Sequence, residues 1–247
     1  MTDGKDLTGR ILKTAKEAGA DLVTVADTRI FSDSGYTGKH PAAVWDQASA
    51  IILIAVPVPR GAFLPLPAGR GIYTNTLMAG TATLRVIAYR IARLIEAEGF
   101  LASIAPSEGS EFGYWYADRT TLMADFSMKY AAYRTGMGSF GKNHLLITDA
   151  YGSRVRLTAV LTNAPLITDT GDRPFLHQAC QDCSACIDAC PVQAIRTDGS
   201  IARDRCAEYM FTALGGLRCG LCIRACPLSA GPPAQRNDER EGRAEEI

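Results

Sequence analysis

Hydrophobic residues in the first hundred positions switch between helical and strand-like spacing. Apolar side chains recur every three or four positions within residues 7–18, which predicts an amphipathic helix. The same spacing predicts a longer helix over residues 76–98. The run AIILIAV at residues 50–56 is apolar throughout, as in a strand that is buried on both faces. These patterns predict a domain of mixed helices and strands.

Shorter elements complete the expected domain. The pattern predicts strands at residues 21–26, 100–105, 145–148 and 156–162, and helices at 41–47 and 122–134. Residues 57–71 contain four prolines and three glycines, which indicate a long loop. Such a loop is either functional or only a surface excursion.

The composition changes after residue 178, because all eight cysteines lie between positions 180 and 226. The first block reads C-x2-C-x2-C-x3-C-P, and the second reads C-x2-C-x3-C-P behind one upstream cysteine. This spacing is typical of proteins with two [4Fe–4S] clusters, in which the cysteine before proline ligates the other cluster. We therefore predict two clusters, one held by Cys180, Cys183, Cys186 and Cys226 and the other by Cys190, Cys206, Cys219 and Cys222.

Zinc and disulfides are the competing interpretations of these cysteines. Structural zinc sites usually pair two C-x2-C knuckles without a three-cysteine turn and Cys-Pro. Disulfides need an oxidising compartment, whereas the start of the sequence shows no secretory or twin-arginine leader. No apolar run is long enough to cross a bilayer, so we expect a cytoplasmic chain with no membrane partner. The iron–sulfur interpretation is favoured.

Charge adds little to this picture. The chain has 26 Lys and Arg residues and 26 Asp and Glu residues, so its formal net charge is zero. That balance argues against a dedicated nucleic-acid-binding protein but leaves room for a local basic groove. The last residues, 231–247, are charged and poor in hydrophobics, and we expect them to be disordered.

A glycine motif, GMGSFG, occupies residues 136–141 and fits G-x-G-x-x-G. A dinucleotide fingerprint follows a strand and opens a helix, whereas here a predicted helix comes first and a strand follows. We therefore do not interpret the motif as a dinucleotide site. Gly136 could end the preceding helix, or the small residues could let the backbone approach a flat ligand closely.

The stretch YAAYRTGMGSFGKNHLLITDAYGSRVRLTAVLTN, followed by the cysteine blocks, resembles epoxyqueuosine reductases and corrinoid reductive dehalogenases. The resemblance implies an α+β protein, with a nitroreductase-like (B12-chaperone-like) α/β domain at residues 1–175 and a ferredoxin-like two-[4Fe–4S] module at 176–230. It also implies cobalamin bound base-off, since the sequence lacks D-x-H-x-x-G. The residues that would hold this cofactor are Gly138, Ser139, Phe140, Lys142, Asn143, His144 and Leu146.

The resembling reductases place an aspartate proton donor after the strand that corresponds to residues 100–105. This sequence reads Pro106-Ser107-Glu108 there, without an aspartate. The candidate proton donors lie in the insert that follows, and they are Glu108, Glu111, Tyr114, Tyr116 and Asp118. Of these, Tyr114, Tyr116 and Glu108 are the ones that we predict as catalytic. Alternatively, the aromatic insert is a lid or a subunit contact without an acid–base role.

Two functional hypotheses follow. In the first, the chain is a cobalamin-dependent reductase that takes electrons from a small donor such as ferredoxin or flavodoxin and acts on a small-molecule substrate. In the second, it is an electron-transfer or corrinoid-handling protein without substrate chemistry of its own. A flavin in the α/β domain is a third option. The sequence lacks the C-terminal extension that helps the resembling tRNA-modifying enzymes to hold tRNA, so tRNA is not an expected partner.

Overall fold

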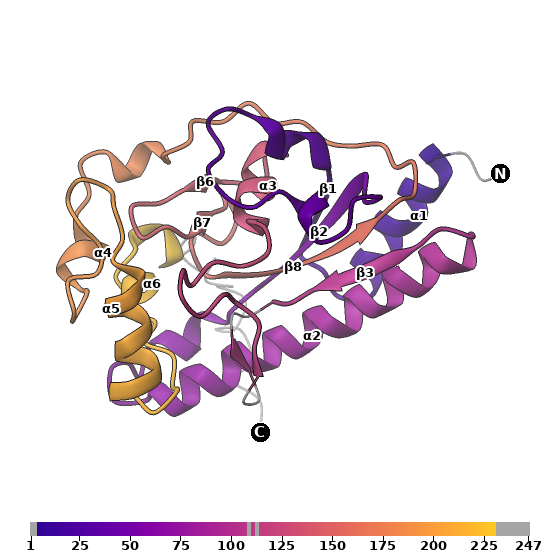
Figure 1. The fold of residues 1–247 in the computed structure, drawn as a ribbon. Coiled ribbons are helices and arrows are strands. Elements are labelled where there is room, and N and C mark those ends of the chain that lie inside the picture. Colours follow the sequence, from indigo (N-terminus) through magenta and orange to yellow (C-terminus); the bar gives the residue numbers. More distant parts are fainter. Residues whose placement is uncertain (1–3, 108–109, 112–113, 231–247) are drawn as a thin grey trace, which may run out of the picture.

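The computed structural model describes residues 4–107, 110–111 and 114–230. Its centre is a four-stranded antiparallel sheet in the order β1-β2-β8-β3, shown in Figure 1. The strands span Leu22–Asp27 (β1), Ala50–Pro57 (β2), Ala102–Ala105 (β3) and Val155–Thr162 (β8). All four coincide with predicted strands to within two residues at each end, so the mixed α/β character that was expected is confirmed.

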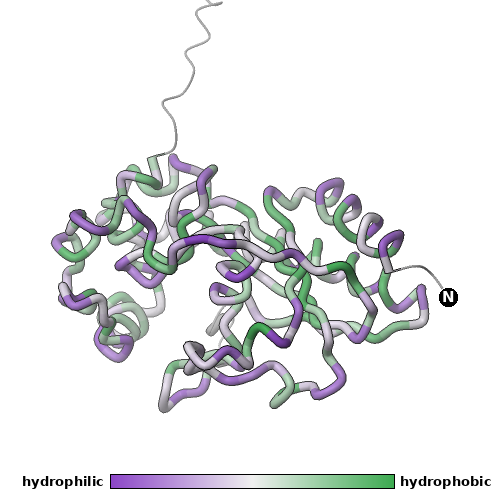
Figure 2. Tube along the Cα trace, turned by 90° about the horizontal axis from the view of Figure 1, so that it is seen from above, coloured by the Kyte–Doolittle hydropathy of each residue, from purple (hydrophilic) through white to green (hydrophobic). Residues whose placement is uncertain are grey.

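Two helices cover one face of the sheet, namely α1 (Gly4–Glu17) and α2 (Arg70–Ala97). Buried Leu7 and Ile11 of α1 and Leu84 and Ile91 of α2 pack in one core with the β2 strand. Figure 2 shows α1, beside the N-terminus, alternating between hydrophilic and hydrophobic positions along the tube. The helical spacing read from the sequence thus produces this layer.

The other face of the sheet is covered by α3 (Met128–Arg134) and the segments around it. The prediction of a helix from residue 122 is wrong at its start. Ser127 caps the helix, because its side chain accepts a hydrogen bond from the backbone N–H of Tyr130. The preceding turn is held by the Asp118 carboxylate, which accepts from the backbone of Thr121 at 2.7 Å.

The Pro/Gly-rich stretch at 57–71 is not a surface excursion. It contains the 3₁₀ turn η3 (Arg60–Phe63), and Phe63 and Leu66 are buried beside Tyr73 of α2. Helix α2 also begins six residues earlier than the sequence predicts, directly after Gly69. This small core is partly covered by Leu221 and Ile223 from the cysteine-rich end of the chain. The loop is therefore a platform on which the C-terminal part packs.

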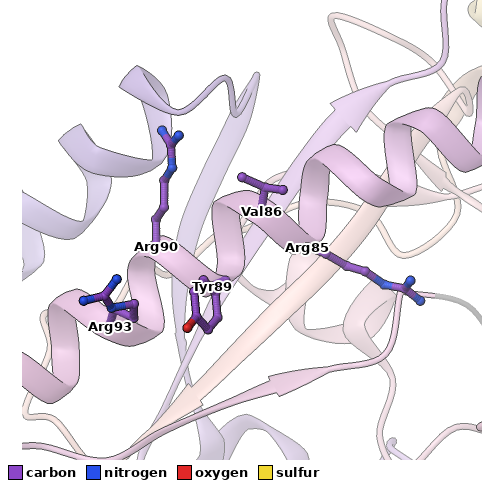
Figure 3. Close-up of a pocket in the computed structure, with 5 residues that line it drawn as sticks. All are labelled: Arg85, Val86, Tyr89, Arg90 and Arg93. Carbon is purple, nitrogen blue, oxygen red and sulfur yellow. The ribbon is translucent and has the colours of Figure 1, made fainter.

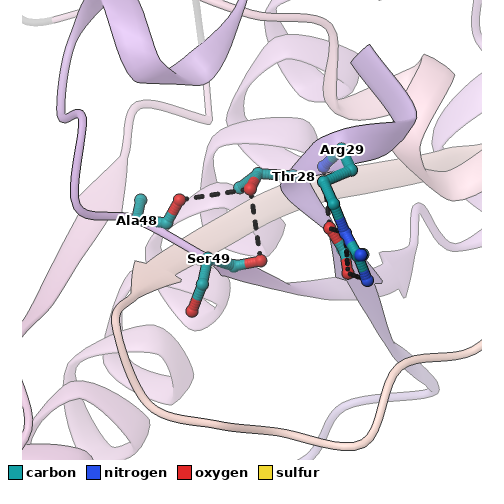
Figure 4. A network of polar contacts seen from close by, with 5 residues as sticks. Thr28, Arg29, Ala48 and Ser49 are labelled. Carbon is teal, nitrogen blue, oxygen red and sulfur yellow. Dashed lines mark hydrogen bonds and ion pairs between the residues drawn. The ribbon is translucent and has the colours of Figure 1, made fainter. Parts of the chain in front are cut away.

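Polar contacts close the end of the sheet opposite that platform. The hydroxyl of Thr28, at the start of η1 (Thr28–Ser32), donates to the backbone oxygens of Ala48 and Ser49 at 3.1 and 3.2 Å. Next to it, the Arg29 guanidinium forms an ion pair with Asp27 at 2.6 Å, as Figure 4 shows. These contacts fix the chain where it leaves β1 and returns to β2.

The rest of the chain is made of short elements. The insert contains a hairpin of β4 and β5, and a second hairpin of β6 and β7 follows α3. Their bounds, with those of the remaining turns and helices, are Pro41–Ala43 (η2), Ser110–Glu111 (β4), Tyr114–Trp115 (β5), Ser139–Phe140 (β6), Leu146–Ile147 (β7), Gln178–Cys180 (η4), Ala185–Asp188 (α4), Arg203–Glu208 (α5), Tyr209–Ala213 (η5), Leu221–Arg224 (α6) and Pro227–Ala230 (η6). Within the described residues, none of the helices has the length and apolarity that crossing a membrane requires.

Candidate iron–sulfur and cofactor site

The cysteines lie on the short turns at the C-terminal end of the fold. In the first block, the chain passes from η4 into the four-residue helix α4, and Cys190 follows that helix. In the second block, Cys219 and Cys222 flank Gly220, which adopts a left-handed conformation with φ 70° and begins α6. Helices α4 and α6 contact each other. The last cysteine of each block is thereby brought toward the other block.

The charges of neighbouring cysteines affect the pKa values of the thiols in two sets. Burial raises the pKa of Cys186 to about 11, and the next largest causes are the charges of Cys180 and Cys226. Burial raises the pKa of Cys222 to about 12, followed by the charges of Cys219, Cys206, Cys186 and Cys190. Apart from the effect of Cys186 on Cys222, these influences follow the ligand sets expected from the spacing. We call Cys180, Cys183, Cys186 and Cys226 the first cysteine group, and Cys190, Cys206, Cys219 and Cys222 the second.

The chemistry of these thiols suits clusters. All eight cysteines are free of disulfides. Thiols with a raised pKa stay protonated at neutral pH unless a metal displaces the proton, and iron in a cluster does so. Within the described residues, no three His, Cys, Asp or Glu side chains converge to hold one metal ion. The case for clusters therefore rests on the spacing and on the two groups.

The predicted cofactor residues form a turn between α3 and β7, and three of them contact the cysteine-rich segment. The Lys142 ammonium donates to the backbone oxygens of Gln181 and Cys183 at 2.9 and 3.1 Å. The His144 ring, through Nε2, is 2.7 Å from the backbone oxygen of Gly199. The Phe140 ring stacks on Phe175 with centroids 4.7 Å apart. The turn thus forms one side of a seam with the first cysteine block.

The other four predicted cofactor residues shape the turn itself. A side chain at Gly138 would overlap the backbone oxygen of Ile147, so this glycine allows β6 and β7 to pack closely. Ser139, Asn143 and Leu146 are buried. The Asn143 side chain accepts from the backbone N–H of Leu145 at 3.2 Å. The small residues therefore serve contacts within the chain, and whether the turn also holds a cofactor stays a prediction.

The structure shows how the glycine motif begins. Helix α3 precedes it and the short strand β6 lies within it, whereas a dinucleotide fingerprint follows a strand and opens a helix. Gly136 has φ 80° and lies just past the helix end, and Met137 N–H donates to the oxygen of Ala132 at 2.9 Å. This is the pattern of a glycine that ends a helix. The expected helix before the motif is confirmed.

Each of the three histidines forms a hydrogen bond to the backbone through one ring nitrogen. His40 and His177 each accept a backbone N–H through Nδ1, at 3.0 and 3.2 Å, and so cap short turns. His144 is held by Gly199 at the seam. Beside it, the Lys129 ammonium donates to the His144 backbone oxygen. Burial, and then the charge of Arg203, lowers the pKa of Lys129 to about 8.

Of the candidate proton donors, Tyr116 lies near the edge strand β3. Tyr116 lines a cavity of about 190 Å³ together with Ser107 and Asp125, and its side chain is 40% exposed. Glu108 and the side chain of Tyr114 lie outside the described part of the chain. The cavity is smaller than most small-molecule sites. It could admit a small group but could not enclose a corrin.

Sequence reasoning missed the contacts that the N-terminal end of α2 makes with the second cysteine group. A Cβ at Gly220 would lie 2.5 Å from the Tyr73 ring, and Tyr73 is only 1% exposed. Arg70, the first residue of α2, is held by Tyr209, which lies between Cys206 and Cys219 in the sequence. These residues are separated by well over a hundred positions. No local pattern could have paired them.

Comparison with known proteins identifies a matching family and several relatives of this chain. Residues 179–230 match the family described as "4Fe-4S dicluster domain". The epoxyqueuosine reductase of Bacillus subtilis (strain 168) is 30% identical over 139 residues, which cover 50% of this chain and 35% of that protein. The tetrachloroethene reductive dehalogenase of Desulfitobacterium hafniense is 29% identical over 116 residues, 38% of this chain and 21% of that protein. This chain is a relative of both. The resemblance expected from the glycine turn and the cysteine blocks is confirmed, and the matches span about a third or less of these relatives.

Solved structures are similar to this chain over most of its length. An epoxyqueuosine reductase bound to a tRNA stem loop superposes with a TM-score of 0.63 and 20% identity, over 92% of this chain and 66% of that chain. A catabolic reductive dehalogenase superposes with a TM-score of 0.73 and 17% identity, over 92% of this chain and 32% of that chain. The chain therefore has the mixed α/β fold of these proteins, with an iron–sulfur domain of ferredoxin type. A nitroreductase-like assignment is a finer prediction.

One expectation about partners is wrong. The lack of a helical C-terminal extension gave the expectation that tRNA is not a partner. A structural neighbour with the same fold has been solved with a tRNA stem loop. A missing extension says nothing about the surface of the shared fold, and so it gives no ground for excluding tRNA.

Proposed function

We propose that this chain is a reductase that stores and relays single electrons through two [4Fe–4S] clusters. The first and second cysteine groups hold one cluster each, with Cys226 and Cys190 crossing between the blocks. The observation that carries the proposal is the spacing of the eight cysteines within the segment that matches the 4Fe-4S dicluster domain, with α4 and α6 in contact between the two blocks. Neighbouring clusters suit one-electron transfer from a donor to an acceptor.

The acceptor that we propose is a base-off cobalamin at the seam between the turn (residues 136–146) and the first cysteine block. When bound, it would supply a metal centre that accepts electrons one at a time and drives a reductive cleavage. Three features support this position. Lys142 ties the turn to the Cys183 loop. The sequence also lacks D-x-H-x-x-G, which is consistent with a cofactor without a histidine ligand. Both relatives' names also denote reductive enzymes.

The residues at the seam have distinct tasks in this proposal. Lys142 fixes the distance between the turn and the cysteine loop, and His144 orients the turn toward Gly199. Away from the seam, Tyr116 lines the small cavity beside β3 and would hold a proton for a reacting group that enters there. Tyr114 and Glu108 remain candidates for the same role. Replacing Tyr116 with Phe should slow the proton-transfer step without changing reduction of the clusters.

A tRNA stem loop is the substrate-bearing partner that we propose, on the likeness to the enzyme solved with one. A basic surface is available for it. The outer face of α2 presents Arg85, Arg90 and Arg93 with Tyr89, which is 59% exposed (Figure 3). Together with Val86 these residues line an open groove of about 400 Å³. Arginines bind phosphate and an exposed aromatic ring can stack on a base. We call this group the arginine face of α2.

The cobalamin proposal is tested by adding cob(II)alamin to anaerobic protein with full clusters. We expect the absorption and EPR spectra to change to the base-off form, without nitrogen hyperfine splitting from an axial ligand. His144→Ala should behave in the same way, because no histidine coordinates the metal in this proposal. Gly138→Val is not a useful variant, since a side chain there would disrupt the β6–β7 hairpin. Unchanged spectra would favour an electron-transfer protein without substrate chemistry.

A further inference from the structure

The second cysteine group lies against a different part of the molecule from the first. Leu221 and Ile223, which flank Cys222, pack on the small core formed by Leu66 and Tyr73. The backbone N–H of Arg218, next to Cys219, donates to the Thr74 hydroxyl at 2.9 Å. The N-terminal end of α2 therefore forms part of the environment of this group.

Arg70 begins α2, and two of its three guanidinium nitrogens have partners. Nη1 donates to the oxygen of Pro67 at 2.8 Å, and Nη2 donates to the hydroxyl of Tyr209 at 3.1 Å. The guanidinium also lies 5.9 Å from the centre of the Tyr209 ring. Tyr209 is three residues past Cys206. The arginine head group is thus held beside the segment that joins Cys206 to Cys219.

The third nitrogen, Nε, is buried and has no hydrogen-bond partner among the described residues. Arg70 also forms no salt bridge with any carboxylate in the described part of the chain. A buried N–H without an acceptor costs about 1–3 kcal/mol, so a bound group that accepts this hydrogen bond is expected. Sulfur in a cluster is an acceptor that the apo chain does not supply.

Geometry also brings α2 to the Cys219 loop. Arg218, next to Cys219, is bonded to Thr74, and Gly220 packs on the Tyr73 ring, both within one turn of Arg70 on the helix. A second donor already reaches the group, because the N–H of Ala194 points at the Cys190 sulfur at 3.2 Å. The second cysteine group therefore lies between the first turn of α2 and a backbone donor.

We propose that Arg70 donates through Nε to a sulfur of the cluster held by the second cysteine group and raises the reduction potential of that cluster. Reduction adds one electron and hence one negative charge to an already anionic cluster. A nearby cation and an N–H···S bond favour the more negative state, and both are known to set cluster potentials. This inference rests on the proposed assignment of cysteines to clusters. Because Arg70 belongs to α2, docking of the cysteine-rich segment would then control how readily this cluster takes an electron.

The test is an anaerobic redox titration, with dithionite as reductant, followed by EPR. Arg70→Gln removes the charge, and we expect one cluster signal to move to a more negative midpoint potential while iron content stays complete. Arg70→Lys keeps the charge and should lie between Gln and wild type. Lys13→Gln, which removes an exposed positive charge on α1, is the control and should titrate like wild type.

The shifted signal must belong to the second cysteine group. In a Cys226→Ser background, which alters the other cluster, Arg70→Gln should still shift the remaining signal. Unchanged potentials in Arg70→Gln, a shift of the other cluster, or a Lys variant that titrates like Gln would each overturn the proposal. If Gln at position 70 lowers iron content, Tyr209→Phe provides a second route. It releases Arg70 from its hydroxyl partner and should also lower the potential. Protein without clusters would contradict the proposed function before this test begins.

Discussion

Cys226 distinguishes two arrangements of the clusters. In cross-ligation it binds the cluster of the first block, and in a simpler arrangement each block of cysteines holds its own cluster. It lies in the second block of the sequence, but its charge acts on Cys180 and Cys186 of the first. It is also buried, with 9% of its surface exposed. The contact between α4 and α6 makes this crossing geometrically direct.

Replacing Cys226 with Ser should therefore alter the cluster held by Cys180, Cys183 and Cys186, because serine is a poorer iron ligand than a thiolate. The measurement is EPR of the dithionite-reduced protein. Cys222→Ser is the matched control, since it removes a ligand only four residues away but from the other cluster. If both variants change the same EPR signal, the assignment is wrong.

Lys129 provides a test at high pH. Its pKa is lowered to about 8 by burial, and then by the charge of Arg203, from an ordinary value near 10.5. The unfolded chain therefore binds more protons than the native one between these two values, and native stability contributed by this site rises with pH there. Below pH 8 the full cost of the buried charge is present.

We expect the stability of wild type relative to Lys129→Met to rise as the pH increases from 8 to 10. The measurement is the thermal midpoint of both proteins in anaerobic buffer. Lys13→Met, on the exposed side of α1, serves as the control and should show no such trend. A difference between wild type and Lys129→Met that is constant with pH would mean that Lys129 titrates normally.

How far residues could be predicted depended on whether their partners are local. Seven of the eight cysteines were found because their spacing of two or three intervening residues is itself the geometry of a cluster turn, and Cys206 was assigned because it completes the second set of four. Gly136 was open to two interpretations until its φ of 80° decided for the helix end. Arg70 and Lys129 were not found, because their partners are distant in sequence and their significance lies in burial.

Among the elements, α2 has two separate tasks. Its N-terminal turns bury Tyr73 under the cysteine-rich segment, while its middle exposes the arginine face. Tyr73 packs against Phe63 with ring centroids 5.1 Å apart. Burial raises the pKa of its hydroxyl well above the ordinary value, so the ring stays neutral. Its contribution is packing between the two parts of the chain.

Tyr73→Ala should lower the free energy of unfolding by about 3–5 kcal/mol, as expected for deleting a buried aromatic side chain. Because Gly220 packs on this ring, the same variant should also lose iron faster in the presence of a chelator. Ile72→Ala, at an adjacent position that is 61% exposed, is the control and should change neither value appreciably. Equal effects of the two variants would show that the packing at Gly220 is not important.

The arginine face of α2 makes the partner proposal testable. We expect a tRNA anticodon stem loop to bind wild type and to bind more weakly to an Arg90→Gln, Arg93→Gln double variant. Each arginine that no longer neutralises a phosphate should reduce the slope of log affinity against log salt by about 1. Fluorescence anisotropy across a salt series measures both effects. Lys13→Gln on α1 is the control, and equal binding by all three proteins would exclude this face as the RNA-binding surface.

Elements with strong periodicity could be read from the sequence, and weakly periodic ones could not. The strand predicted at 50–56 and the long helix, apart from its first six residues, were correct because uniform or amphipathic burial leaves a clear pattern. The helix predicted from residue 122 was too long because the Ser127 cap outweighs the apolar residues before it. The hairpin inside the insert left no pattern, since two-residue strands carry no period.

At the scale of the molecule, the sheet with its helices and the cysteine-rich segment meet in two places. One is the small core of Leu66, Tyr73 and Leu221, and the other is the seam formed by Lys142 and His144. Neither contact follows from spacing along the chain. The sequence could therefore predict the α/β part and the cysteine-rich segment, but not that the Pro/Gly-rich stretch supports the cysteine-rich segment.

The central claim is that the eight cysteines hold two [4Fe–4S] clusters, and the metal and sulfide content of anaerobically purified protein tests it most directly. Two such clusters require about eight iron atoms and about eight acid-labile sulfides per chain. We expect that content in wild type, with little zinc. Near-stoichiometric zinc without sulfide, or about four iron atoms with four cysteines left free, would contradict the claim.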